Sequence, residues 1–261
     1  MTPVFSQHNG DLPLLVSVPH DGREIPGDVA ARMSDAGRSI PDTDWHVAEL
    51  YAFAREMGAS TVVANYSRYV VDLNRSADDA ALYPGQVATG LCPLQTFAGV
   101  PIYRDGGVDD SEKAQRIDAY WRPYHEHIRQ SLEALRERHG YALLWDAHSI
   151  PSCVPRLFDG ELPHLNLGSN GSASCGAAIE AAVAEVATGS NYSSVVNGRF
   201  KGGYITRHYG APGERIHALQ LEIAQRAYMD EETTTIDEAK AAELRAVLRE
   251  MLQAFLRAAK R

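Results

Sequence analysis

The chain has 261 residues, with 25 lysines and arginines against 34 aspartates and glutamates, and a formal net charge of -9 at pH 7. Hydrophobic residues make up 44% and charged residues 23%, which is typical of a globular domain and excludes disordered, collagen-like and coiled-coil chains. The acidic balance argues against a protein that binds nucleic acid or an anionic membrane by neutralising phosphates. An anionic ligand would have to be recognised by a few local arginines.

The N-terminal stretch lacks a basic start followed by a long apolar core, and no window approaches the roughly 18 apolar residues of a membrane span. The three cysteines, Cys92, Cys153 and Cys175, are widely spaced and suggest neither a disulfide framework nor a CxxC metal site. We therefore expect a cytoplasmic protein with free thiols.

Strand-like and helix-like segments alternate along the chain. Apolar, β-branched runs predict strands at 14–18, 61–64, 69–73, 141–145 and 217–221. Apolar residues at helical spacing predict helices at 44–57, 111 to about 138, 172–187 and 236–259, with Pro123 marking a kink or a start in the second. We expect one α/β domain over residues 1–261, with a mixed, mostly parallel sheet and helices on both faces.

The segment from about 75 to 110 shows little periodicity. It contains the sequence LYPGQVATGLCPLQTFAGVPIYRDGG, which is rich in glycine and proline. A loop of this length inside a compact domain is usually functional. We expect it to form part of the wall or lid of an active site.

Groups that can bind a metal or transfer a proton stand at the ends of three predicted strands. His20 follows the first, Asp146 and His148 follow the fourth, and Glu222 closes the last. Ligands of open α/β sheets bind beyond the carboxyl ends of the strands. Imidazole and carboxylate groups from separate strands suit a catalytic metal site, in which the metal activates water and polarises a carbonyl group for amide hydrolysis. Histidines that are only hydrogen-bonded in loops are the alternative interpretation.

A third metal ligand could come from Asp42 or Asp44, which stand at the mouth of a predicted helix. A carboxylate at a helix start is also a common N-cap, so the two interpretations stay open here. The sequence contains no dinucleotide-binding glycine motif, no Walker motif and no GxSxG nucleophile motif.

Two arginines stand in contexts that suit binding of a carboxylate. Arg75 ends the sequence DLNR, and its planar guanidinium can hold a carboxylate through two hydrogen bonds while the adjacent Asn74 holds the same group. Arg207 lies in the glycine-bounded segment 201–210, where the backbone can approach a ligand. A surface arginine in a salt bridge is the alternative for Arg75.

Several stretches of the chain together resemble the N-formylglutamate amidohydrolase family of histidine degradation. They are LLVSVPHDGREIP, IPDTDWHVAELY, VVDLNR with the following LYPG, LLWDAHSIPS, and GRFKGGYITRHYG followed by LQLEIAQRAYM. The resemblance runs from about residue 14 to residue 229. The DLNR sequence and the order His, carboxylate, Arg, His, Glu are also similar to aspartoacylase and the zinc carboxypeptidases, whose fold this family resembles.

The resemblance implies a metal-dependent hydrolase that cleaves N-formyl-L-glutamate to formate and L-glutamate. It implies His20 and His148 as metal ligands and Asp44 as the carboxylate ligand, with Asp42 as the competitor. The carboxypeptidase pattern has a glutamate three residues after the first histidine, where this chain has Arg23. Zn²⁺ is the expected ion, with Co²⁺, Fe²⁺, Ni²⁺ and Mn²⁺ as alternatives.

The same resemblance implies roles for four further residues. Glu222 would take a proton from the attacking water and give it to the departing amine. Asn74 and Arg75 would bind one carboxylate of the substrate and Arg207 the other. Two alternatives remain: an aspartoacylase-like or peptide amidase acting on another N-acyl acidic amino acid, and a binding protein for an acidic ligand without catalysis.

Overall fold

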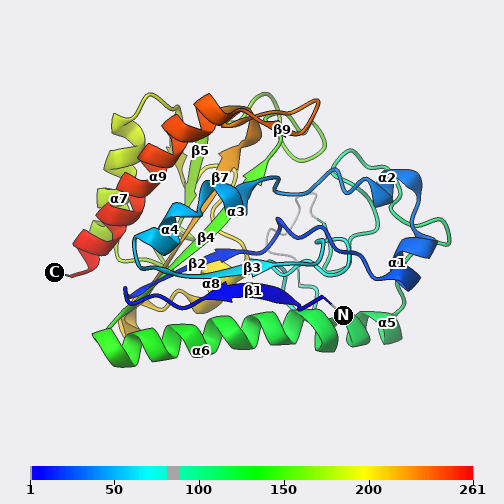
Figure 1. Ribbon diagram of the computed structural model, residues 1–261, viewed down its shortest axis with the longest axis horizontal. Coiled ribbons are helices and arrows are strands. Elements are labelled where there is room, and N and C mark those ends of the chain that lie inside the picture. The colour runs from blue at the N-terminus through cyan, green and yellow to red at the C-terminus, as the bar shows by residue number, and fades with distance from the viewer. Residues whose placement is uncertain (1, 81–88, 261) are drawn as a thin grey trace.

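A central sheet with helices on both faces organises the computed structural model of the chain (Figure 1). The structure describes residues 2–80 and 89–260. The sheet has the strand order β1-β3-β2-β4-β7-β5-β6, and a small separate sheet pairs β8 with β9. The strands are β1 (Phe5–His8), β2 (Leu14–Val18), β3 (Ser60–Ala64), β4 (Ala142–Ile150), β5 (Leu165–Gly168), β6 (Ser194–Val196), β7 (Ile216–Ala224), β8 (Met229–Asp230) and β9 (Thr235–Ile236).

The strands at the centre of the sheet run parallel. β2 pairs in parallel with β3 and β4, and β4 pairs in parallel with β7. β5 pairs in parallel with β6, whereas β1 joins β3, and β5 joins β7, in antiparallel fashion. The predicted mixed, mostly parallel α/β sheet is therefore confirmed.

Helices cover the sheet on two sides. They are α1 (Gly27–Arg32), α2 (Asp35–Arg38), α3 (Val47–Leu50), α4 (Phe53–Glu56), α5 (Asp110–Arg116), α6 (Arg122–His139), α7 (Ala177–Gly189), α8 (Tyr204–Tyr209) and α9 (Glu238–Ala259). In Figure 1, α6 runs along one side of the sheet, and α7 and α9 lie on the other. None of these helices is long and apolar enough to cross a membrane, a finding that covers residues 2–80 and 89–260.

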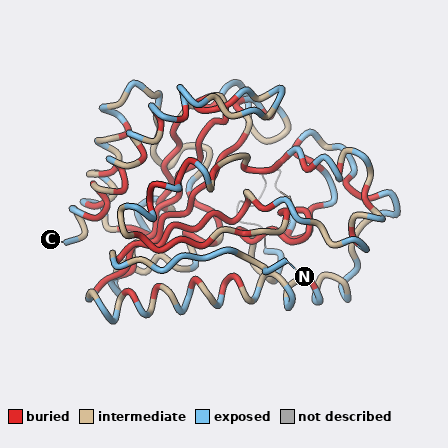
Figure 2. The backbone as a smooth tube through the Cα atoms, viewed as in Figure 1, coloured by how far each residue is buried: buried red, intermediate tan, exposed pale blue. Residues whose placement is uncertain are grey.

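The alternation of side chains along β2 divides the hydrophobic core between the two faces of the sheet. Leu14 and Val16 pack in a cluster with residues of α7 and α9. Leu15 lies in a second cluster with Ile128 and Leu132 of α6. Figure 2 shows the buried chain running through the middle of the molecule, with the exposed segments at the helix surfaces and loop ends.

Three predicted helices differ from the structure in detail. The segment 44–57 forms the two short helices α3 and α4. His46 takes a left-handed conformation with φ 62° just before α3, and a turn at Tyr51 and Ala52 separates α3 from α4. The long helix begins after Asp109, which caps the backbone N–H of Glu112, and a π-helical segment, Ile117–Trp121, separates α5 from α6. The helix predicted from residue 172 begins at α7.

The predicted strand at 69–73 is wrong, because the segment forms turns and irregular chain. Side chains and a neighbouring loop satisfy its backbone groups in place of a strand ladder. The hydroxyl of Tyr103 donates to the carbonyl of Tyr69 at 3.0 Å, and the guanidinium of Arg116 donates to the carbonyl of Val70 at 2.9 Å. A buried, β-branched run can therefore occur without strand pairing where buried donors reach it.

Part of the glycine- and proline-rich segment expected at about 75–110 contributes to the site. Thr89 and Phe97, two of its described residues, line the pocket discussed below. The LYPG sequence, at 82–85, lies outside the described residues.

Candidate active site

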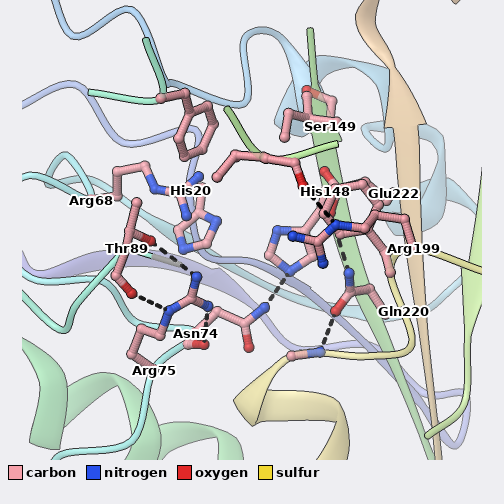
Figure 3. Close-up of a pocket in the computed structure, with 15 residues that line it drawn as sticks. His20, Arg68, Asn74, Arg75, Thr89, His148, Ser149, Arg199, Gln220 and Glu222 are labelled. Atoms are coloured by element: carbon pink, nitrogen blue, oxygen red, sulfur yellow. Dashed lines mark hydrogen bonds between the residues drawn. The ribbon is translucent and has the colours of Figure 1, made fainter. Parts of the chain in front are cut away.

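The parallel strands bring the predicted chemical groups to one edge of the sheet. His20 follows the end of β2, His148 lies on β4, and Glu222 lies opposite His148 in the register of β7. The strands β4 and β7 extend further than predicted, so His148 and Glu222 lie within them. Figure 3 shows all three side chains at the same pocket.

The carboxylate of Asp44 lies close to the rings of both histidines. Its Oδ2 lies 3.1 Å from Nδ1 of His148 and 3.7 Å from Nδ1 of His20, and it accepts the backbone N–H of Ser149 at 3.0 Å. The backbone N–H of Asp44 donates to the carbonyl of His20 at 3.1 Å, which fixes the loop against the end of β2. His20, Asp44 and His148 are all buried, and each offers one ligand atom within 4.8 Å of the others.

The hydrogen bonds around His20 leave one ring nitrogen suited to a metal. Its Nε2 lies 2.7 Å from Oδ1 of Asp72, whereas its buried Nδ1 has no hydrogen-bond partner. A neutral imidazole that donates from Nε2 to a carboxylate presents its Nδ1 lone pair, an arrangement usual for histidines that bind metals. Because that lone pair faces Asp44, the two histidines and the carboxylate form a donor set that fits a divalent ion.

Asp42, the competing carboxylate, lies outside this group of three. Its Oδ2 accepts the hydroxyl of Tyr69 at 2.6 Å and the backbone N–H of Phe97 at 2.7 Å. Burial raises the pKa of Asp42. The carboxylate of Asp42 thus anchors the loop that carries Phe97, while Asp44 faces the histidines.

Arg68 is buried beside these acidic groups. Its guanidinium donates to Oδ2 of Asp72 at 2.7 Å and lies 3.5 Å from Oδ1 of Asp44. Burial acts to raise the pKa of Asp72, but its electrostatic interactions with the His20 ring and the Arg68 guanidinium outweigh burial and hold that pKa well below its usual range. Asp72 is therefore a charged carboxylate that orients His20.

Glu222 has an environment suited to proton transfer. It is buried, and Nε2 of Gln220 donates to its Oε2 at 3.2 Å. Burial is the main cause that raises the pKa of Glu222 to about 8, with the charge of Asp44 acting in the same direction and His148 opposing it. A carboxyl group whose pKa lies near neutrality is suited both to accepting and to donating a proton.

Asn74 and Arg75 both line the pocket. The amide of Asn74 lies with Nδ2 3.0 Å from Nε2 of His148, and its Oδ1 accepts the backbone N–H of Ile205 at 2.8 Å. The guanidinium of Arg75 donates to the carbonyl and the hydroxyl of Thr89, at 2.9 and 3.0 Å. The DLNR segment therefore connects the histidine centre with the wall of the pocket.

The arginines that line the pocket differ in part from those expected from the sequence. Arg207 is not among the described residues that line it, and its Nε donates to the carbonyl of Gly202 at 2.8 Å. Arg68 and Arg199, which the sequence analysis did not select, do line it. Arg199 stands in the quoted sequence GRFKGGYITRHYG, which also contains Arg207.

A model of a known protein family covers the residues of this site. The family model for N-formylglutamate amidohydrolase matches residues 12–229. The chain belongs to the N-formylglutamate amidohydrolase family. This span contains the three histidine and carboxylate residues of the centre, Glu222 and the pocket arginines.

Relatives match along almost the whole chain. The N-formylglutamate deformylase of Pseudomonas putida is 50% identical over 259 residues, covering 98% of this chain and 97% of the relative. The protein of the same name from Pseudomonas aeruginosa is 51% identical with the same coverage. The crystal structure of N-formylglutamate amidohydrolase from Ralstonia eutropha JMP134 superimposes with a TM-score of 0.82 at 26% identity, covering 98% of this chain and 97% of that one.

The geometry predicts different consequences for the two neighbouring aspartates. Asp44→Asn replaces a charged carboxylate ligand that faces both histidines with a neutral amide. Affinity for Zn²⁺ should therefore fall on the order of 100-fold or more, which exceeds the loss usual when a residue that only hydrogen-bonds to a metal ligand is changed. Asp42→Asn is the matched control, because an asparagine oxygen can still accept from Tyr69 and Phe97. Competition titration with a chromogenic chelator measures both affinities. Equal losses in the two variants would contradict the assignment of Asp44.

Proposed function

We propose that this protein hydrolyses the amide of N-formyl-L-glutamate to formate and L-glutamate, using one divalent metal ion held by His20, Asp44 and His148. The observation that carries the proposal is the buried His, Asp, His centre at an arginine-lined pocket, in a chain half identical to proteins named N-formylglutamate deformylase. The proposed reaction is the hydrolysis of a linear amide bond and is a step of histidine degradation.

Charge supports a cation at this centre. The carboxylates of Asp44, Asp72 and Asp146 are buried around the two histidines, with Glu222 nearby, and Arg68 supplies one buried positive charge. Buried charges are costly unless they are paired. A bound divalent ion would offset this excess, polarise a carbonyl oxygen and lower the pKa of a bound water to about 7. The nitrogen and oxygen donors suit Zn²⁺ first, with Co²⁺, Fe²⁺, Ni²⁺ and Mn²⁺ as alternatives.

Glu222 is the proposed proton-transfer residue. It lies across from His148 on the neighbouring strand, within the pocket that would hold the formyl group. As a carboxylate it accepts a proton from the attacking water, and as an acid it donates that proton to the nitrogen of the departing glutamate. The amide of Gln220 holds the carboxyl group of Glu222 in place through the bond to Oε2.

The two carboxylates of the substrate require two positive groups. We assign one to Arg75, supported by Asn74, and the other to Arg199. In the view of Figure 3, Arg75 and Arg199 approach the pocket from opposite sides of His148. Two guanidinium groups placed in this way match a dicarboxylate with the amide bond between them. Arg207, expected from sequence, is the competing candidate for the second carboxylate.

Substrate choice is tested most directly with metal-replete protein and a panel of N-formyl, N-acetyl and peptidyl derivatives of glutamate and aspartate. We expect release of free amine from N-formylglutamate with the highest kcat/KM, and loss of that activity after chelation with recovery on adding Zn²⁺. Faster turnover of the N-acetyl or peptidyl compounds would favour an aspartoacylase-like or peptide amidase. Binding of these compounds without turnover would favour a binding protein.

Glu222→Gln separates proton transfer from metal binding. The amide keeps the size of the side chain but cannot take up or release the proton, so kcat should fall by about 10²–10⁴-fold. Zn²⁺ affinity should stay close to that of the wild type, because Glu222 is not one of the three clustered ligands. Chelator competition and steady-state assays on the same preparation measure both quantities. Wild-type kcat in this variant would remove Glu222 from the chemistry.

Lysine substitutions compare the three arginines under the same change of chemistry. Arg75→Lys and Arg199→Lys should each raise KM for N-formylglutamate by about tenfold or more, because a point charge replaces a two-pronged donor. Arg207→Lys is the matched comparison outside the pocket lining, and we expect its KM to be near that of the wild type. A raised KM in Arg207→Lys, with the KM of Arg199→Lys unchanged, would assign binding of the second substrate carboxylate to Arg207.

A further inference from the structure

Asp146 is a buried carboxylate that the proposed chemistry does not use. It lies on β4 with no exposed surface, two residues before His148, so both side chains lie on the same face of the strand. Its Oδ2 lies 3.1 Å from Nε2 of His148. The same oxygen lies 3.3 Å from Oγ1 of Thr206 and 3.4 Å from Nδ2 of Asn74, while Oδ1 accepts from Ser17 at 3.4 Å.

The contacts around the His148 ring are compatible with two tautomers. With the proton on Nδ1, that nitrogen donates to Asp44 and Nε2 accepts from the amide of Asn74. With the proton on Nε2, Oδ2 of Asp146 is the carboxylate oxygen in ion-pair contact with that nitrogen, at 3.1 Å, and the lone pair on Nδ1 faces Asp44. Only the second tautomer offers Nδ1 to a metal ion, since a protonated ring nitrogen has no free lone pair.

We propose that Asp146 is the positioning residue that selects the metal-binding tautomer of His148, by accepting the proton on its Nε2. This inference rests on the metal centre put forward under the proposed function. The amide nitrogen of Asn74 cannot replace Asp146 in this role, because it is a donor, and its oxygen is already bonded to the backbone N–H of Ile205. Asp146 therefore has the same role toward His148 that Asp72 has toward His20. The distance between Oδ1 of Asp72 and Nε2 of His20 is 2.7 Å.

The position of Asp146 also connects the metal centre with the substrate side of the pocket. Thr206 belongs to α8, and Asn74 precedes Arg75 in the DLNR segment. Both side chains direct a donor at the oxygen that faces His148. One buried carboxylate thus orients a metal ligand and contacts both α8 and the DLNR segment, of which Asn74 and Arg75 line the pocket. Outer partners of this kind typically change metal affinity by about 10–100-fold.

Zn²⁺ affinity in three variants tests the proposal. Asp146→Leu removes the acceptor at similar side-chain length and should weaken Zn²⁺ binding by about 10–100-fold. Asp146→Asn can still present an oxygen to Nε2, so its loss should be smaller than that of Asp146→Leu. Ser17→Ala is the matched control, because it removes a donor to the other oxygen of Asp146, and its affinity should change by much less than tenfold.

Nitrogen-15 NMR of histidine in the Zn²⁺-loaded protein distinguishes tautomer selection from a structural role, because it reports which ring nitrogen carries the proton. In the wild type, we expect the His148 proton on Nε2 and the metal on Nδ1, with the Nε2 proton shifted by a hydrogen bond. If Asp146→Leu fails to fold, Asp146→Asn carries the test, and that proton should then show a weaker hydrogen-bond shift. A proton on Nδ1, a metal on Nε2, or an unchanged shift in Asp146→Asn would overturn the proposal.

The titration also separates this inference from the proposed function. Wild-type protein that binds no divalent ion would overturn the metal centre, and the role of Asp146 with it. Wild-type protein that binds one equivalent of Zn²⁺, with Asp146→Leu binding equally well, would overturn the role of Asp146 alone.

Discussion

Burial of negative charge at the carboxyl edge of the sheet is the constraint on which the rest of the site depends. Asp44, Asp72 and Asp146 are almost completely removed from solvent, and each contacts a histidine ring. Removing carboxylates from water is tolerated only when donors or cations surround them. Arg68 and the two histidines meet part of this requirement, and a divalent ion between the Nδ1 atoms and Asp44 would meet the rest.

Positive charge placed locally explains how an acidic protein can bind a dianion. The net charge of -9 works against attraction of N-formylglutamate at long range. The positive groups are instead concentrated in the pocket, where Arg75 and Arg199 stand beside the proposed metal centre. Affinity and specificity then depend on short, geometrically defined hydrogen bonds, and the field of the whole molecule contributes little.

Local sequence pattern was sufficient for the parts of the site that follow strands. His20, His148 and Glu222 could be found because each follows or lies in an apolar run, and parallel strands bring such positions to one edge. The run at 69–73 shows the limit of that signal, because side-chain donors from distant segments satisfy its backbone. Periodicity contains no information about such long-range partners.

The choices between near neighbours could not be made from the local sequence pattern. Asp42 and Asp44 are two residues apart, yet Asp42 accepts the backbone N–H of Phe97 whereas Asp44 faces His148. Arg199 and Arg207 lie in one glycine-rich stretch of the sequence, and the fold places Arg199 in the lining of the pocket. Contacts such as that of Asp72 with His20 join residues 52 positions apart.

In the proposed site, His20, Asp44 and His148 together hold one catalytic metal ion. Crystals of the protein grown with Zn²⁺ and measured on both sides of the zinc absorption edge test it most directly. We expect one strong anomalous peak, contacted by Nδ1 of His20, Nδ1 of His148 and the carboxylate of Asp44. A fully active protein with no peak between these three side chains, or with its zinc bound elsewhere, would rule out this metal centre.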